Sequence, residues 1–305
     1  MMNGANMKKR FSSYWNQPKH AAYLFITPSL LFLTVFVFVP LIIALFLGFF
    51  QVNLFFKDTM FVLFDNFTRA FQDERVMGSF LNTTYFVLLE TPIQVFIGLV
   101  VAVLVTQNTY FNRFLRSIYF IPVICSMTAI GIIWSMVLDS NIGIIPYYIY
   151  RLGFEKPLML RDPNWAMPIV ALLTVWRNFG HTMIILVAGI SSIPGTYYEA
   201  ARIDGASSIQ QFIRITIPLL LPALGFCMVT NLIGSFQVFD QVYVATRGGP
   251  MFRTETVVQY IYTRAFKAPY ELGYASAIAF LLFLLIAVFS LILNHRLRRQ
   301  EEKMF

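Results

Sequence analysis

Charge is scarce in this sequence. Of its 305 residues only 12% are charged, whereas 58% are hydrophobic and 17% are aromatic. An ordinary soluble domain carries roughly 25% charged residues, so this composition excludes a protein that faces water on all sides. There are only two cysteines and three histidines, which excludes a disulfide scaffold, and the histidines form no metal-ligand cluster.

The sequence also lacks the motifs of an enzyme. No Gly-Lys pair occurs in it, so the phosphate-cradling loop G-x-x-x-x-G-K-[ST] is absent and any ATP hydrolysis belongs to another chain. His20, His181 and His295 lie at two membrane borders and within an apolar run, with no nucleophile poised beside them. We therefore predict no catalytic residue, no metal and no cofactor bound by this chain.

What the sequence does contain is long apolar runs that are almost free of charge. A helical bilayer crossing needs roughly 20 mostly apolar residues, and closed helices leave no unpaired backbone in lipid. Six such runs occur, at 22–50, 81–106, 114–138, 167–190, 219–243 and 274–293. The first is too long for the apolar part of a signal peptide. We predict an all-α integral membrane protein with six transmembrane helices.

Basic residues set the expected orientation, because loops rich in Lys and Arg stay on the cytoplasmic side. They gather in both tails, as Lys8, Lys9, Arg10 and Lys19 and as Arg296, Arg298, Arg299 and Lys303. We predict one membrane domain, 21–294, between cytoplasmic tails at 1–20 and 295–305. The net charge of +8 then reports orientation in the membrane, and no nucleic-acid partner is inferred from it.

The cytoplasmic segment 193–222, between the fourth and fifth runs, is unlike the rest and predicts two short helices. Thr196 and Glu199 have the spacing of a capping box that would open the first helix. Gly205 should end it, because glycine tolerates the left-handed conformation of helix ends. Ser207 or Ser208, with Gln210 or Gln211 three residues on, can cap the second helix.

The spacing in this segment resembles a known family. The string Glu199-Ala-Ala-x-x-Asp-Gly-Ala, then Phe212 and Ile215-x-Ile-Pro-x-x-x-Pro, resembles the EAA loop of permease subunits in binding-protein-dependent ABC importers. The stretches Thr246-Arg-Gly-Gly-Pro-x-x-x-Thr-Glu-Thr and Leu272-Gly-Tyr-Ala-Ser-Ala-Ile-Ala are similar to its carbohydrate-uptake class, with MalF-like and UgpA-like members. The resemblance implies a type I ABC importer permease fold.

The resemblance also implies what the loop does. In that family the loop, here 191–222, forms a coupling helix that sits in a cleft of a cytoplasmic ATPase. Glu199 would pair with a basic group of the ATPase, Ala200 and Ala201 would pack into the cleft, and Gly205 would be the bend. Asp204 and Ala206 complete the expected contact.

The partners implied by the resemblance are a second permease subunit in a heterodimer, two cytoplasmic ATPases that hold ATP and Mg, and an extracytoplasmic sugar-binding protein. The location implied is the bacterial cytoplasmic (inner) membrane. Two rival functions stay open: an ion-coupled secondary sugar transporter, which would not need ATP, and a membrane enzyme or scaffold, which would not need an ATPase partner.

Polar residues within the apolar runs are candidates for a sugar path. Trp176, Asn178, Asn231, Ser235 and Gln237 offer an aromatic face and hydrogen-bonding groups, which suit a sugar. The alternative is that they join helices, a common use of polar side chains in membranes. For each of the five residues, both alternatives stay open: that it lines the sugar path, or that it packs between helices.

Two charges lie deep inside the runs, away from their ends: Glu90 and Arg177. An unpaired charge inside a membrane costs roughly several kcal/mol. Glu90 and Arg177 are expected to lie at matching depths in the membrane. We predict that they form a buried ion pair joining the second and fourth helices, as a structural strut more than a substrate contact.

Outside the membrane, apolar residues between positions 257 and 266 recur with helical spacing. We expect an amphipathic helix there. Lipid is favoured as the surface it meets, with a substrate-binding protein as the alternative.

Overall fold

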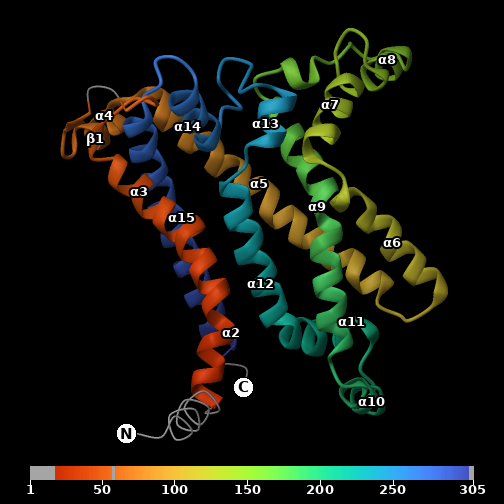
Figure 1. Cartoon of the computed structure of the whole chain (residues 1–305). Helices are drawn as coiled ribbons and strands as arrows, with labels where there is room; N and C mark the ends of the chain where they lie inside the picture. Colours follow the sequence, from red (N-terminus) through yellow and green to blue (C-terminus); the bar gives the residue numbers. More distant parts are fainter. Residues whose placement is uncertain (1–17, 57–58, 302–305) are drawn as a thin grey trace, which may run out of the picture.

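The computed structural model describes residues 18–56 and 59–301, which are mostly helical (Figure 1). Five helices in this part of the chain are long and apolar enough to cross a membrane: Phe25–Leu47, Glu74–Val105, Ala166–Ser191, Ser208–Phe236 and Leu272–Arg299. A sixth crossing is counted if two helices that meet at a sharp bend form one span. The predicted all-α membrane fold is confirmed.

The first crossing is made of α2 (Pro18–Leu33), a π-helical turn (Thr34–Phe38) and α3 (Val39–Leu47). The wide turn ends two residues before Pro40, which has no N–H for the helical ladder. Its apolar side chains from 25 to 43 are largely exposed, and α3 touches α15 (Leu272–Glu301). Such exposure suits a helix that meets lipid or another subunit.

The third predicted span is not one helix, which corrects the prediction for 114–138. It is divided into α6 (Tyr110–Ile124) and α7 (Met127–Val137), which are bent by 92°. Cys125 and Ser126 between them have extended backbone. Figure 1 shows the two helices as an elbow beside α9 (Ala166–Ser191).

The fifth span also differs from the prediction of 219–243. It begins in the loop, where α11 (Ser208–Gln211) continues through a π-helical turn (Phe212–Thr216) into α12 (Ile217–Phe236). It ends early, and α13 (Asp240–Ala245) is a separate short helix. The second helix of the predicted loop is therefore the first turn of a membrane helix.

The remaining short elements lie at the end of the molecule opposite α10 (Gly195–Ile203) and α11 (Figure 1). Strand β1 (Phe50–Gln51) pairs antiparallel with β2 (Met60–Phe61), with Phe50 opposite Phe61. The helices there are α4 (Asp65–Gln72), α8 (Ile144–Arg151), α13 and α14 (Val257–Phe266), with a 3-10 turn at Met159–Arg161. We call this the outer end.

The central helix is α5 (Glu74–Val105), which packs against α9, α12 and α14. Apolar clusters join it to α15 near the outer end and to α9 and α12 farther in. The helix predicted near 257–266 is present as α14, but Val257 and Tyr260 are buried against α5 and α15. Its apolar face therefore meets protein, which corrects the expectation of lipid.

Candidate functional site

The loop between α9 and α12 is a helix–turn–helix with defined ends. Helix α10 stops in a Schellman motif, in which the Ala206 N–H donates to the Ala201 carbonyl (2.8 Å) and the Gly205 N–H to the Arg202 carbonyl (3.1 Å). Gly205 has φ +77° there, as predicted. Ser207 and Gln210 then form the predicted capping box, so the sequence itself dictates this stop and restart.

The start of α10 differs from the prediction. The helix begins at Gly195 with Pro194 as its N-cap, and no side chain caps it. Thr196 and Glu199 therefore do not form the expected capping box. This leaves the Glu199 carboxylate exposed on the surface of α10, free for another contact.

The six residues expected to contact an ATPase lie in the second half of α10 and in the turn that follows it. Glu199, Ala200, Asp204 and Gly205 are exposed, and Ala201 and Ala206 are partly covered. Large apolar side chains that sequence reasoning did not single out are exposed beside them: Tyr197, Ile203, Ile209 and Ile213. Ile203 is 87% exposed. A solvated loop has no reason to carry this much exposed apolar surface, so it suits a docking face.

The loop is fastened to the membrane helix that follows it. The Tyr198 and Thr216 hydroxyls lie 2.9 Å apart, linking α10 to the base of α12. The Gln211 amide donates to the Ala206 carbonyl at 3.0 Å. Because α11 and α12 are continuous, α10 is joined to the base of α12 both along the chain and through the Tyr198–Thr216 contact.

Deeper in the bundle, buried polar groups connect α5, α9 and α12. The Ser235 hydroxyl donates to the Glu90 carboxyl, and the Thr91 hydroxyl reaches the same carboxyl oxygen at 3.2 Å. One turn farther in, the amides of Gln94 and Asn231 each donate to the Thr182 hydroxyl at 3.1 Å. We call these six residues the buried polar network.

The predicted ion pair between Glu90 and Arg177 is absent, and the prediction was wrong. Within the described part of the chain Glu90 has hydroxyl partners only. The Arg177 guanidinium instead donates to the carbonyls of Val123 and Cys125, both at 3.1 Å, and to the Asn178 side chain at 2.7 Å. These carbonyls are the ones that the elbow removes from the helical ladder, so Arg177 caps the end of α6.

The five path candidates do not converge in this chain. Asn231 and Ser235 belong to the buried polar network, where they join helices. Asn178 accepts from Arg177 at the elbow. Trp176 packs edge-on against Trp134 at 5.7 Å, beside an apolar cavity of about 560 Å³, and Gln237 is exposed at the end of α12.

An uncovered stripe runs along α12 on the side away from the network. Phe226, Thr230, Gly234 and Gln237 follow one another at intervals of three or four residues, and all four are exposed. Sequence reasoning found only Gln237, because periodicity alone does not say which face of an apolar helix is left open. This stripe is the better candidate for a path wall.

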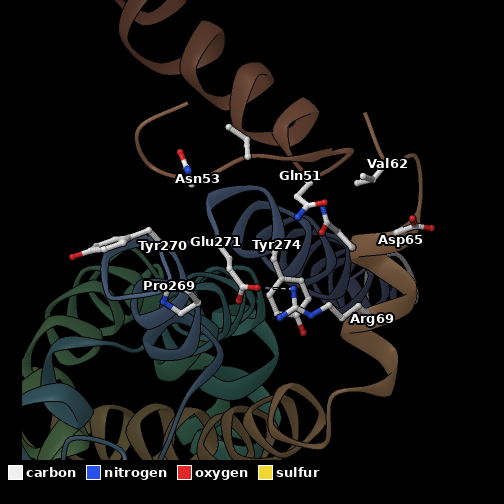
Figure 2. Close-up of a pocket in the computed structure, with 11 residues that line it drawn as sticks. Gln51, Asn53, Val62, Asp65, Arg69, Pro269, Tyr270, Glu271 and Tyr274 are labelled. Carbon is white, nitrogen blue, oxygen red and sulfur yellow. Dashed lines mark hydrogen bonds and ion pairs between the residues drawn. The ribbon is translucent and has the colours of Figure 1, made fainter. Parts of the chain in front are cut away.

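At the outer end, charged and phenolic groups gather around a cavity of about 420 Å³. Figure 2 shows Arg69 of α4 beside the Tyr274 ring and joined to Glu271. The ion pair between Arg69 and Glu271 has a length of 2.7 Å. Asp73, at the start of α5, accepts from the Tyr260 and Tyr274 hydroxyls at 2.7 and 2.9 Å. These contacts fasten α4 and α5 to α14 and α15.

The same contacts shift two pKa values. Burial alone would raise the pKa of Asp73, but the two phenol hydrogen bonds and the backbone amides of Arg75 and Val76 outweigh it and lower that pKa. Burial, with the bond to Asp73, raises the pKa of Tyr260 to about 12. The carboxylate is therefore charged, and the phenol neutral, across the physiological range.

The comparisons with known proteins agree with this architecture. The family model described as "Binding-protein-dependent transport system inner membrane component" matches residues 94–301. The chain belongs to this family. It is therefore a multi-pass transport component of the membrane and not an enzyme.

Individual relatives cover almost the whole chain. It is 32% identical over 280 residues to the probable ABC transporter permease protein YurN of Bacillus subtilis, covering 90% of this chain and 95% of YurN. It is 29% identical over 287 residues to the lactose transport system permease protein LacF of Rhizobium radiobacter, covering 92% and 94%.

A solved structure shares the fold. The crystal structure of a bacterial alginate ABC transporter, in complex with an alginate pentasaccharide-bound periplasmic protein, contains a chain with a TM-score of 0.79. The two chains are 23% identical, over 94% of this one and 98% of the other. This likeness identifies the fold as that of an ABC importer permease.

Proposed function

We propose that this chain is the permease subunit of an ATP-driven importer for an oligosaccharide or a related sugar, and that it translocates its substrate by alternating access. The observation that carries the proposal is the exposed, apolar face of α10 and α11, which is continuous with a membrane helix. Such a face suits a partner that pushes on the loop. The similarity to LacF, together with the carbohydrate-class motifs, supports a sugar as the substrate.

The proposed assembly contains a second, different permease subunit, two ATPases on the cytoplasmic side and an extracytoplasmic sugar-binding protein. ATP and Mg are held by the ATPases. Glu199 and Asp204 supply charge, and Ala200, Ala201 and Ala206 let the ATPase approach the backbone, while Gly205 keeps the bend. Closure of the ATPases then moves α10 and, through α11, the base of α12.

The proposed orientation places α10 and α11 in the cytoplasm. The start of α2 and the end of α15 lie at the same end of the molecule as α10 (Figure 1), which suits two cytoplasmic termini in a bacterial inner membrane. The basic residues Lys8, Lys9, Arg10 and Lys303, on which the prediction partly rests, lie outside the described residues. The whole chain, with 21–294 as its membrane part, forms a single domain in this proposal.

The stripe on α12 is the proposed wall of the sugar path, with Gln237 and Thr230 as hydrogen-bonding groups and Trp176 of α9 as an aromatic surface. Asn178 lies at the elbow, whereas Asn231 and Ser235 act through the network behind the wall. The second permease subunit would supply the opposite wall. An ion-coupled mechanism is not favoured, because Arg177 is engaged in capping α6.

The test is whether the loop binds an ATPase. Ala200 is exposed, so Ala200→Trp leaves the fold of this chain undisturbed but blocks close approach of a partner. We expect Ala200→Trp and Glu199→Ala to lower recovery of the ATPase in gentle purification. Glu155→Ala, which removes an exposed carboxylate at the outer end, is the matched control and should behave as wild type. Equal recovery with all three variants would contradict the proposed docking face.

A further inference from the structure

Glu90 is a carboxyl group inside the membrane bundle, and none of the described residues forms an ion pair with it. Its residue is 2% exposed, and in the described part of the chain its partners are the hydroxyls of Ser235 and Thr91. A charged carboxylate in a low-dielectric interior is unfavourable unless a cation or several donors compensate it. Both hydroxyls reach the same carboxyl oxygen, Oε2, so the other oxygen receives neither of them.

A second observation points to the same place. Gln94 lies one helical turn farther along the same face of α5 and is 2% exposed. Its side-chain oxygen is buried, and no group in the described part of the chain donates a hydrogen bond to it. Its amide nitrogen is already used, in donating to Thr182. A buried acceptor without a donor is costly. Two polar side chains lie one turn back along the helix, Thr91 and Glu90, and the Thr91 hydroxyl is engaged with Glu90 Oε2 and the Ser235 hydroxyl. This leaves the Glu90 carboxyl, which can donate only if it carries a proton.

No other titratable group on the neighbouring helices is placed to compensate a charge on Glu90 or to donate to the Gln94 oxygen. On α9, Arg177 is turned to the elbow and His181 lies on the exposed face. The titratable residue on α12 is Cys227, which lies about two helical turns from Ser235, toward the coupling loop. On α14, Tyr260 and Arg264 bind Asp73 or each other at the outer end, and α15 has no titratable residue between Tyr274 and His295.

We propose that Glu90 is a neutral carboxylic acid, with its proton on Oε1 directed to the Gln94 side-chain oxygen, and that in this form it positions α12 against α5. The neutral acid accepts the Ser235 and Thr91 hydroxyls on one oxygen and donates from the other. Loss of the proton places a charge between α5 and α12 and removes the donor for Gln94. The contact between the two helices then opens to water or to a cation.

This contact bears on transport because of where Ser235 lies. It is in the last turn of α12, the helix that begins in the coupling loop. Glu90 therefore fastens the far end of that helix to α5, the central helix of the bundle. The proposed protonation state rests on the positions of the Glu90 and Gln94 side chains, whereas its consequence for uptake rests on the proposed function.

Infrared difference spectroscopy tests the protonation state in the purified full-length protein. We expect the difference between wild type and Glu90→Gln at neutral pH to contain the carbonyl band of a protonated carboxylic acid. A difference that contains only carboxylate bands would overturn the proposal. It would mean that the Gln94 amide is reversed and donates to a charged Glu90. This readout requires neither ATP nor a substrate, so it stands even if the proposed function fails.

The pH profile of uptake tests the positioning role in the assembled importer. Glu90→Gln keeps a neutral side chain of the same size, so we expect wild-type uptake at neutral pH and less loss than wild type at alkaline pH. Once the pH exceeds the pKa of Glu90, each further pH unit lowers the fraction of wild-type protein with a protonated Glu90 about tenfold. Glu90→Ala and Ser235→Ala should lower uptake at every pH.

The matched control is Ser79→Ala. Ser79 is equally buried on α5, but its hydroxyl bonds only within its own helix, to the Val76 carbonyl, so we expect wild-type uptake from this variant. The positioning role is overturned if Glu90→Gln follows the wild-type profile at alkaline pH, or if Ser235→Ala is as active as Ser79→Ala.

Discussion

At the scale of single residues, the loop depends on one backbone conformation. Gly205 ends α10 at φ +77° with open space around it, so the backbone and not crowding requires glycine there. Gly195, at the start of the same helix, also has open space but an ordinary φ. A comparison of substitutions at these two glycines therefore isolates the effect of the left-handed backbone conformation from any effect of crowding.

We predict that Gly205→Ala destabilises the turn by about 1 kcal/mol, because an L side chain is unfavourable in the left-handed region. Gly195→Ala should leave it unchanged or slightly stabilised. Hydrogen exchange of the amides between 196 and 211 measures this, with faster exchange expected in Gly205→Ala only. The same exchange rates in both variants would contradict the role given to Gly205.

A single charge also explains why the ion-pair prediction failed. Matching depth along two helices says nothing about the direction in which each side chain points, and Arg177 points to α6. Its partners are backbone carbonyls that are available as acceptors because the third span is bent there. The sequence shows that Arg177 is present, but hydropathy does not predict the bend, because it measures how apolar a segment is and not the direction of its helix.

At the scale of elements, the elbow between α6 and α7 depends on that cap. Carbonyls at the end of a helix need a partner, and at membrane depth water does not supply one. The guanidinium is planar and charged, so it serves two carbonyls at once.

We predict that Arg177→Ala lowers the free energy of unfolding by about 2 kcal/mol, and that Arg177→Lys recovers part of it. Arg113→Ala is the control, since Arg113 is exposed on α6, where its guanidinium donates to the Asn108 side chain and lies near the Tyr110 ring; its effect should stay below about 0.5 kcal/mol. Thermal unfolding in detergent measures all three. Equal losses for Arg177→Ala and Arg113→Ala would show that the cap contributes nothing.

The outer end joins four helices through Asp73, and this makes it sensitive to acid. Because the pKa of Asp73 is lowered in the folded chain, its charge stabilises the fold above about pH 4, the ordinary aspartate range. That stabilisation is lost as the pH falls through the lowered pKa.

We predict that Asp73→Asn, which can still cap α5, is less stable than wild type at pH 7 and that the difference shrinks as the pH falls toward about 3. Asp65→Asn, on the exposed first turn of α4, should show little difference at any pH. Thermal unfolding across this range is the measurement. A constant difference for Asp73→Asn would mean that its charge is not what stabilises the outer end.

At the scale of the whole molecule, the sequence was most informative where composition and local chemistry decide the outcome. Uncharged runs located the membrane helices, and Gly205 with Ser207 located the turn in the loop. It was least informative about faces: the exposure of Ile203, the inward turn of α14 and the open stripe on α12 all depend on which helices are neighbours. Neither periodicity nor spacing contains that information.

In the proposed function, the loop of α10 and α11, the continuous membrane helix α12 and the central helix α5 transmit force from one side of the membrane to the other. The loop is exposed and apolar, α12 begins within it, and the buried polar network joins α12 to α5. An importer of this design needs ATP on the loop side and fails when the loop is uncoupled.

The most direct test is ATP-dependent uptake of a labelled oligosaccharide into proteoliposomes that contain this chain with its co-purifying subunits. We compare the native complex with Glu199→Ala combined with Gly205→Pro, since proline cannot adopt φ +77° or donate to the Arg202 carbonyl. The account predicts uptake only with ATP, and loss of uptake and of its coupling to ATP hydrolysis in the variant although it inserts normally. Uptake by this chain alone, unchanged by the variant or by withdrawal of ATP, would contradict it.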